Sequence, residues 1–556
     1  MDWIRTSLIA SMAVVTWLLI IEWNRFEPES VDFPITETVL SQEDRSDDVP
    51  YAVLQKSDDY LPSEKKGGEV NFFDSENLGG IVTIITDVFK VNIDLRGGDI
   101  VGVELLKHLS AMPEDDGRPI KILQRSPQTN YIATSGLIGP NGTDSREKGR
   151  PVFSSLKNNY ELGKDEKITV DLTADQGSVE FTKRFIFTRS GYDIEVSYLI
   201  NNKGLSDWRG SFFGQIKRDN SLPVQLDTVL GQRPFLGGAL KEPDKNFAKY
   251  SLNDIDNDAV SATLKGGWMA FLQHYFVSAW IPPHDEMNRY SFKKSNTQSG
   301  VYLFNFVGEE IRLAEGERGE YTANFYVGPK DQIELGKLAE HLDHVVDYGI
   351  FWIICKPIYQ LLVFIHGVLG NWGWAIVGLT VFIKLLLFPL SAKSLKSMAR
   401  LRSLQPEMER IKELYGDDRQ KMGQEQMALW KKEKVNPVSG CLPMLLQMPV
   451  FISLYWVLME SIEIRHAPWL LWIEDLSAMD PYFVLPLLMG LSMWVMQKLQ
   501  PVPSDPIQAK VMQYMPVAFT FMFLWFPSGL VLYWTVNNLL SLGQQYVINK
   551  QISDIK

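Results

Sequence analysis

Residues 511–549 read VMQYMPVAFTFMFLWFPSGLVLYWTVNNLLSLGQQYVIN and contain no charged side chain. A helix needs roughly 20 residues to cross the hydrocarbon core of a bilayer, and this stretch is about twice as long. Near its middle, Pro527-Ser528-Gly529 is a turn signal. The stretch therefore predicts a hairpin of two membrane spans, at 511–526 and 529–548.

Three further uncharged intervals, at 357–383, 435–459 and 481–497, each predict one span. A sixth span is predicted at the N-terminus, where Arg5 precedes an uncharged stretch over 6–21. A cleaved signal peptide is the alternative, but the residues that follow lack the small side chains of a cleavage site, which favours an anchor. The chain thus predicts a membrane protein with six transmembrane helices.

Lysine and arginine in short loops predict the orientation of these spans. Residues 391–440 carry eleven of them, whereas 461–480 carry only Arg465. The first segment is therefore expected in the cytoplasm, together with both chain ends. The long segment after the first span is expected outside, where large translocated domains are exempt from the charge rule.

The external segment begins with a strongly acidic stretch. Residues 27–76 hold fourteen acidic and four basic side chains, which is typical of a solvated tether. From 78 to 330, short β runs alternate with turn signals such as Arg96-Gly97-Gly98-Asp99, and Val179-Glu180-Phe181-Thr182 alternates with period two. A large antiparallel β-sandwich is the predicted architecture.

Composition excludes several functions. The 556 residues have a net charge of −12, which argues against direct binding of nucleic acid. Two cysteines exclude a disulfide scaffold and suggest no zinc site, and no hydrolase, metalloprotease or nucleotide-binding motif occurs. No catalytic residue, metal or cofactor is therefore predicted. A sugar site at His274, Tyr275 and Trp280 is the alternative, although aromatic side chains at such spacing more often fill a sandwich core.

Lys384 is the outstanding residue of the membrane part. It lies about thirteen residues into a span that starts near Asn371, which places it roughly 20 Å deep. A charge at that depth indicates a functional site that faces a polar interior. The alternative is that its long side chain reaches the cytoplasmic headgroups. Polar residues that favour the functional interpretation lie one turn earlier and on other spans: Thr380, Gln447, Asn537, Asn538 and Gln544.

Two features concern the membrane surface. Apolar residues recur at helical spacing from 331 into 356, which predicts an amphipathic helix on the outer surface. The last two apolar stretches, 512–526 and 530–543, have about fifteen residues each and span about 22 Å as helices. They predict a locally thinned bilayer.

The cytoplasmic segment 391–440 predicts a basic, amphipathic helical hairpin. Pro406 kinks or restarts its first helix, Gly416 ends it, and Asp417 or Asp418 caps the second. Fourteen of the nineteen methionines follow Ser391, and flexible thioethers suit surfaces that accept varied apolar partners, though they also fill ordinary cores. A docking hairpin is predicted, with a solvated loop that only fixes topology as the alternative. Its predicted contact residues are Met398, Met408, Met422, Met427 and Trp430.

Four stretches resemble the signature of the YidC/Oxa/Alb family of membrane protein insertases, in the form with a large periplasmic domain. They are NPVSGCLPMLLQMPVF at 436–451, APWLLWIEDLS at 467–477, DPY at 480–482 and FPSGLVLYW at 526–534. They follow one another in order across the whole membrane part. The resemblance implies a five-helix insertase core that inserts and folds inner-membrane proteins, alone or beside the Sec translocon, without nucleotide or metal.

The resemblance also implies a site. In the family, a hydrophilic groove is open to the cytoplasm and to lipid and is closed on the outside. A positive residue in this groove attracts the acidic segment of a client. Aligned on Phe388-Pro389-Leu390, this residue is Lys384, where the family usually has arginine, so the charge is kept and the bidentate fork is lost. Thr380 matches a groove threonine. The client groove is expected to hold Lys384, Thr380, Gln447, Tyr533, Trp534, Asn537 and Asn538.

The implied partners are nascent membrane proteins, the Sec translocon with its accessory subunits, the lipid bilayer, the ribosome and the receptor of the signal recognition particle. A long basic tail for ribosome binding is not expected, since only Lys550 and Lys556 follow the last span. A polytopic transporter or channel is the alternative function, but it predicts internal repeats that the sequence lacks.

The predicted domains follow in chain order. They are an anchor at 1–23, a tether at 24–77, the β-sandwich at 78–330, an interfacial helix at 331–356, a second span at 357–390, the hairpin at 391–440, a third span at 441–460, a periplasmic loop at 461–481, a fourth span at 482–498, a cytoplasmic loop at 499–510, the last spans at 511–526 and 529–548, and a short tail at 549–556.

Overall fold

A computed structural model describes residues 80–112, 117–144, 149–221, 234–242, 247–296, 298–416, 418–433, 435, 442–499 and 506–553. The predicted N-terminal anchor at 1–23 and the predicted acidic tether at 24–77 lie outside the described residues. The described chain forms two compact units. The β unit holds residues 80–347 with 460–462, and the helical unit holds 348–459 and 463–553.

The β unit contains nineteen strands within the described residues. They are β1 Ile81–Ile85, β2 Phe89–Asp94, β3 Asp99–Leu109, β4 Pro119–Arg125, β5 Asn130–Ile138, β6 Ser154–Ser155, β7 Asn159–Glu161, β8 Lys167–Gln176, β9 Val179–Thr188, β10 Asp193–Asn202, β11 Trp208–Asp219, β12 Gly237–Leu240, β13 Ala248–Ser251, β14 Val260–Lys265, β15 Met269–Leu272, β16 Phe276–Ile281, β17 Met287–Lys294, β18 Val301–Leu313 and β19 Arg318–Pro329. Two short helices, α2 Leu252–Asn257 and α3 Gln332–Leu338, accompany them.

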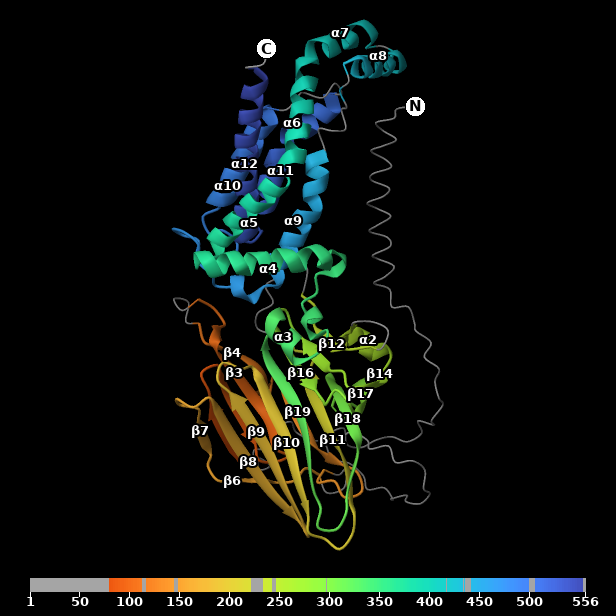
Figure 1. Ribbon diagram of the computed structural model, residues 1–556, viewed down its shortest axis with the longest axis vertical. Helices are drawn as coiled ribbons and strands as arrows, with labels where there is room; N and C mark the ends of the chain where they lie inside the picture. Colours follow the sequence, from red (N-terminus) through yellow and green to blue (C-terminus); the bar gives the residue numbers. More distant parts are fainter. Residues whose placement is uncertain are drawn as a thin grey trace. The chain divides into compact units, whose positions relative to one another are not determined.

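Two sheets pack face to face in this unit (Figure 1). One has ten strands in the order β14-β17-β18-β11-β5-β4-β3-β2-β1-β7, and the other has nine in the order β13-β12-β15-β16-β19-β10-β9-β8-β6. Neighbouring strands are antiparallel, except that β1 and β7 run parallel. One hydrophobic core gathers buried residues from both sheets, and a second cluster packs β12, β15, β16 and β19 against α3. The predicted β-sandwich is confirmed.

Local patterns explain the strands. Gly97 and Gly98 adopt positive φ angles of 77° and 62° in the turn between β2 and β3, as the Gly-Gly signal predicts. Along β9, alternate side chains are buried, among them Phe181 and Phe185. Trp280 is 1% exposed and packs on Phe325 in the core, so the structure favours the core interpretation of the aromatic cluster over a sugar site.

The helical unit contains nine α-helices within the described residues. They are α4 Trp352–Leu369, α5 Trp372–Leu386, α6 Phe388–Ser403, α7 Gln405–Tyr415, α8 Arg419–Lys432, α9 Leu442–Glu460, α10 Val484–Lys498, α11 Pro506–Phe523 and α12 Ser528–Ser553. Within this unit α4 runs crosswise to α9 and α12 (Figure 1). By length and composition, the helix over Gly349–Leu369 is apolar enough to cross a bilayer, and α5 with α6 passes the same test as a pair bent by 66°.

Five helices alternate in direction along the chain: α5, α10 and α12 run one way, and α9 and α11 run the other way. Contacts between the helices show these directions. α5 runs parallel to α12, since Ile376 lies near Gly529 and Lys384 bonds to Ser541, whereas α9 runs antiparallel to α12, since Gln447 bonds to Asn537 and Tyr455 lies near Phe526. α10 runs parallel to α12 through the pairs Ser492–Asn538 and Leu499–Gln545, and α11 runs antiparallel to α10 through the pairs Gln497–Met512 and Gly490–Thr520. A chain that crosses a layer five times in succession has this alternation.

The structure divides the region around residues 331–390 differently from the prediction. One interfacial helix at 331–356 was expected, but α3 ends at Leu338, and α4 runs on to Leu369. The predicted second span at 357–390 is broken, because Gly370 takes a left-handed φ of 68° and ends α4, and the Asn371 side chain accepts a hydrogen bond from Trp374 N and starts α5.

The last two helices are also longer than predicted. α11 has 18 residues and α12 has 26, because both continue beyond the apolar stretches into polar sequence. The thinned bilayer was predicted from the lengths of the apolar stretches, which these bounds do not change, so it stays a prediction.

Candidate functional site

Lys384 lies near the C-terminal end of α5 and is half-buried. Its Nζ donates a hydrogen bond to Ser541 Oγ on α12, at 2.7 Å. The Ser541 hydroxyl in turn donates to the backbone oxygen of Asn537, at 2.7 Å. No acidic side chain pairs with Lys384 among the described residues. The ammonium group is thus held by a neutral partner.

A polar stripe on α12 continues from this contact. Tyr533, Asn537 and Ser541 are spaced four residues apart, so they lie on one face of the helix. From α9, Gln447 Nε2 donates to Asn537 Oδ1 and lies 3.5 Å from the Tyr533 hydroxyl. We call Lys384, Gln447, Tyr533, Asn537 and Ser541 the polar network. It joins α5, α9 and α12.

Three predicted groove residues lie outside the polar network. The Thr380 hydroxyl is buried and donates to the Ile376 carbonyl of its own helix, at 2.6 Å. Asn538 points to α10, where its Nδ2 donates to Ser492 Oγ at 3.0 Å. The Trp534 ring packs edge-on against Phe451, at 4.4 Å between centroids. Thr380 still shares the face of α5 that carries Lys384.

The sequence interpretation missed Ser541, although a signal for it exists. Tyr533 and Asn537 were singled out, and the next residue at that spacing is Ser541. A polar residue that extends a stripe by one turn is expected on the same face.

The predicted docking hairpin is formed by α7 and α8. Pro406 restarts the chain at the beginning of α7, and the Asp418 side chain accepts hydrogen bonds from Gln420 N and Lys421 N to cap α8, as predicted. Met427 is 44% exposed on α8. Of the other predicted contact residues, Met398 on α6, Met408 on α7, and Met422 and Trp430 on α8 are half-buried.

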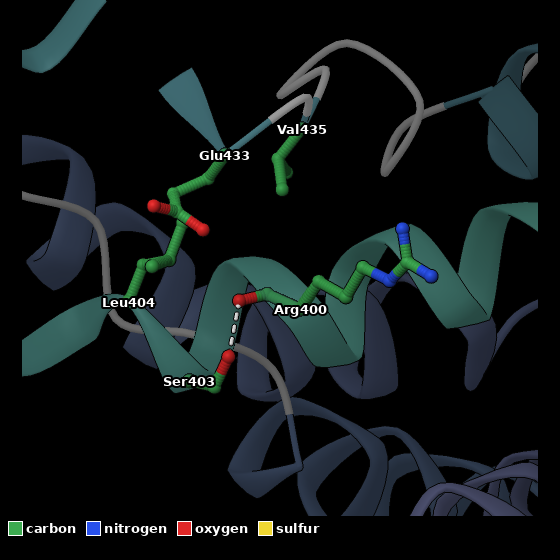
Figure 2. A pocket seen from close by; sticks show the side chains of 5 residues that line it. All are labelled: Arg400, Ser403, Leu404, Glu433 and Val435. Atoms are coloured by element: carbon green, nitrogen blue, oxygen red, sulfur yellow. Dashed lines mark hydrogen bonds between the residues drawn. The ribbon is translucent and has the colours of Figure 1, made fainter. Parts of the chain in front are cut away.

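Figure 2 shows a hollow at the base of this hairpin, lined by Arg400, Ser403, Leu404, Glu433 and Val435. The Arg400 guanidinium points away from Glu433, and the Ser403 hydroxyl donates to the Arg400 carbonyl at 2.7 Å. The hollow has no acid–base pair suited to catalysis. It shows that the chain leaving α8 returns beside the end of α6.

Among the described residues, no group of three or more His, Cys, Asp or Glu side chains is arranged to hold a metal ion.

Comparisons with known proteins agree over the whole chain. A family model described as the 60Kd inner membrane protein matches residues 364–555, and one described as the YidC periplasmic domain matches residues 81–361. Membrane protein insertases YidC of Saccharophagus degradans and Cellvibrio japonicus are 48% and 46% identical, each over 99% of both chains. A solved structure of an active YidC insertase is 17% identical, with a TM-score of 0.37, and covers 84% of this chain and 95% of its own. The chain therefore belongs to the YidC family of membrane protein insertases.

Proposed function

We propose that the polar network receives the polar end of a nascent membrane protein while the apolar segment of that client moves into lipid. The single observation that carries this proposal is the bond between Lys384 and Ser541. A cation held by a hydroxyl keeps its net charge, whereas an ion pair would cancel it. Lys384 is therefore available to attract an acidic client segment across a few ångströms of partly desolvated space.

The driving force in this proposal is the burial of the client's apolar surface, worth about 25 cal/mol per Å². No covalent bond changes, so no catalytic residue is assigned. The network lowers the barrier for the polar end by offering hydrogen-bond partners inside the helical unit. Gln447 and Asn537 supply amide groups, and Tyr533 supplies a hydroxyl.

We further propose six spans, made by the N-terminal anchor with α5, α9, α10, α11 and α12. The alternating directions of the five described helices support this count, and the crosswise course of α4 suits a helix lying on the outer surface. The basic segment with α7 and α8 then faces the cytoplasm with both chain ends, and the β unit faces the periplasm. The protein would reside in the inner membrane.

The hairpin of α7 and α8 is proposed to meet clients before they reach the network. Nascent chains, the ribosome and the receptor of the signal recognition particle are its candidate partners, and the Sec translocon is a candidate partner of the membrane part. Leu414 on α7 is 64% exposed and Met427 on α8 is 44% exposed, among side chains of both charges such as Lys412, Glu413 and Lys431. Such a surface suits apolar segments of varied sequence.

Photocrosslinking to a stalled client tests the proposed site. A crosslinking amino acid replaces Leu385, which is 66% exposed beside Lys384, or Leu491, which is 57% exposed on α10. We expect client adducts from position 385 and few from position 491, because only the former adjoins the network. Equal yields from both positions would show that clients do not pass Lys384.

Replacing both Leu414 and Met427 with Ser is expected to reduce crosslinking of clients to the hairpin about fivefold, since each loses roughly 0.5 kcal/mol of apolar contact. The matched control replaces their exposed neighbours Glu413 and Ala428 with Ser. The yield of hairpin adducts is read from gels of ribosome-bound clients. Unchanged yield in the first variant would leave the hairpin without an apolar docking role.

A further inference from the structure

The Ser541 hydroxyl on α12 faces Lys384 as a hydrogen-bond acceptor. A serine hydroxyl has one proton and two lone pairs, and Ser541 donates its proton to Asn537 O within its own helix, at 2.7 Å. Towards Lys384 it can therefore only accept, and the ammonium donates to it at 2.7 Å. The bond to the Asn537 carbonyl thus orients the lone pairs of Ser541 for the ammonium.

The Lys384 side chain extends along the helices to reach this acceptor. α5 and α12 run parallel, and Ile376 packs beside Gly529. From that contact, α5 advances eight residues to Lys384, about 12 Å, whereas α12 advances twelve residues to Ser541, about 18 Å. Ser541 therefore lies about 6 Å nearer to the C-terminal ends of the two helices than the base of the Lys384 side chain does.

A lysine at this depth has a competing arrangement. Its flexible stem can carry the ammonium past α12 to water and lipid headgroups, which solvate a charge better than one hydroxyl does. The side chain already extends toward the C-terminal ends of α5 and α12, which face the cytoplasm in the proposed orientation. It is only half-buried, so packing alone does not prevent this movement. Among the described residues, the hydrogen bond that stops the ammonium at the polar network is the one to Ser541.

We propose that Ser541 is the positioning residue that fixes the depth of the positive charge, and that this chain needs it because residue 384 is a lysine. The inference rests on the proposed function of the polar network. An ammonium is a point charge on a flexible stem, so its place depends on the acceptor that it finds. A guanidinium presents five donors in a planar fork and can keep bonds to other acceptors of the network when one is lost. Arginine at position 384 would therefore depend less on Ser541.

The depth of the charge determines which clients it attracts. A client carboxylate gains most when it stops within a few ångströms of the ammonium, because the attraction falls with distance. An extended chain advances about 3.3 Å per residue, so a charge held in one place favours one or two positions of an acidic residue in the translocated segment. A charge that is free to move favours no position strongly.

Insertion of a series of clients into vesicles of the full-length protein tests the proposal. Each client carries a single Asp at one of several successive positions of its translocated segment. With the wild-type protein, insertion should peak at one or two of these positions. Ser541→Ala should lower the peak about three- to tenfold, as expected for the loss of one hydrogen bond to a charge, and should leave all positions within about twofold of one another. Ser541→Thr keeps a hydroxyl and should behave like the wild type.

A second background separates positioning from a general structural role. In the Lys384→Arg protein, Ser541→Ala should lower the peak by less than about twofold, since the fork keeps other bonds. Thr535→Val is the matched control on α12. Its buried hydroxyl donates to Val531 O within its own helix, at 2.7 Å, so its loss should leave both the peak and the position dependence unchanged.

Two results would overturn the proposal. One is an unchanged peak and position dependence in the Ser541→Ala protein. The other is an equal loss on Ser541→Ala with lysine and with arginine at position 384, which would indicate a structural role. The proposed function fails separately, if Lys384→Glu inserts acidic clients normally. A defect of Lys384→Glu beside a normal Ser541→Ala protein contradicts the positioning role alone.

Discussion

Lys384→Glu is expected to reduce the insertion of clients with an acidic translocated segment by at least about tenfold, which corresponds to roughly 1.4 kcal/mol. Two unit charges about 4 Å apart interact by about 1 kcal/mol in water and about 4 kcal/mol near a protein surface. The substitution turns this attraction into repulsion. The bond from Lys384 Nζ to Ser541 Oγ adds no opposing charge that would weaken the effect.

Insertion into vesicles of the purified protein, scored by protection of the translocated segment from protease, measures this effect. Lys384→Arg keeps the charge and should stay within about threefold of wild type, although its planar fork bonds differently. A client with a neutral translocated segment is the second control, and it should insert equally well with the wild-type protein and with the Lys384→Glu protein. If the acidic client inserts normally in the Lys384→Glu protein, electrostatic attraction has no part in the mechanism.

The β unit was predictable because its signals are local. Alternation along residues 179–188 and the Gly97-Gly98 turn each determine a strand or a hairpin without reference to distant residues. The start of the Lys384 helix near Asn371 was predicted correctly, but the end of a separate helix at Gly370 was missed, because the uncharged interval 357–383 runs through both residues and was assigned to one span. Hydrophobicity alone does not reveal such a break. A glycine followed by an asparagine does, because glycine commonly ends a helix and asparagine commonly caps the start of the next one.

The candidate site was predictable in part. The depth of Lys384 in an apolar span and the polar residues on α9 and α12 could be recognised from their positions in the sequence. Their hydrogen-bond partners could not, because these depend on how each helix is rotated about its axis. Asn537 and Asn538 are adjacent in sequence, yet one bonds to Gln447 and the other to Ser492. The contacts of the loop over residues 464–480 were unpredictable, because the hydrogen bonds from Ser528 and Gly529 run to backbone carbonyls of this irregular loop.

Arg150→Met is expected to lower the free energy of unfolding of the β unit by about 3–5 kcal/mol. The Arg150 guanidinium bonds to Asp99 and lies 2.7 Å from Asp144 Oδ1, and these two carboxylate side chains are only 7% and 0% exposed. Without Arg150, two buried carboxylates lose their nearest cation. Unfolding of the full chain in urea, followed by brief proteolysis of the β unit, measures the change.

Lys183→Met is the matched comparison in the same cluster and should cost less than about 2 kcal/mol. The Lys183 Nζ donates to the carbonyls of Gly97 and Ser135, both at 2.9 Å, and Arg150 also donates to these two oxygens. Both acceptors therefore keep a partner after the substitution. Equal losses in the Arg150 and Lys183 variants would contradict the assignment of Arg150 as the essential cation.

The pH dependence of the free energy of unfolding further distinguishes Lys183 from Arg150. Burial lowers the pKa of Lys183 to about 7, from 10.5 for an exposed lysine. Between these values the unfolded chain binds a proton that the folded chain has released, so the free energy of unfolding rises with pH by up to about 1.4 kcal/mol per unit and is lost again as pH falls toward 7. The Lys183→Met protein has no group that titrates at this position, so its free energy of unfolding should change less with pH between about 7 and 10.5. Parallel curves for the two proteins would mean that Lys183 keeps its charge in the folded β unit, held there by Asp99 and Asp144.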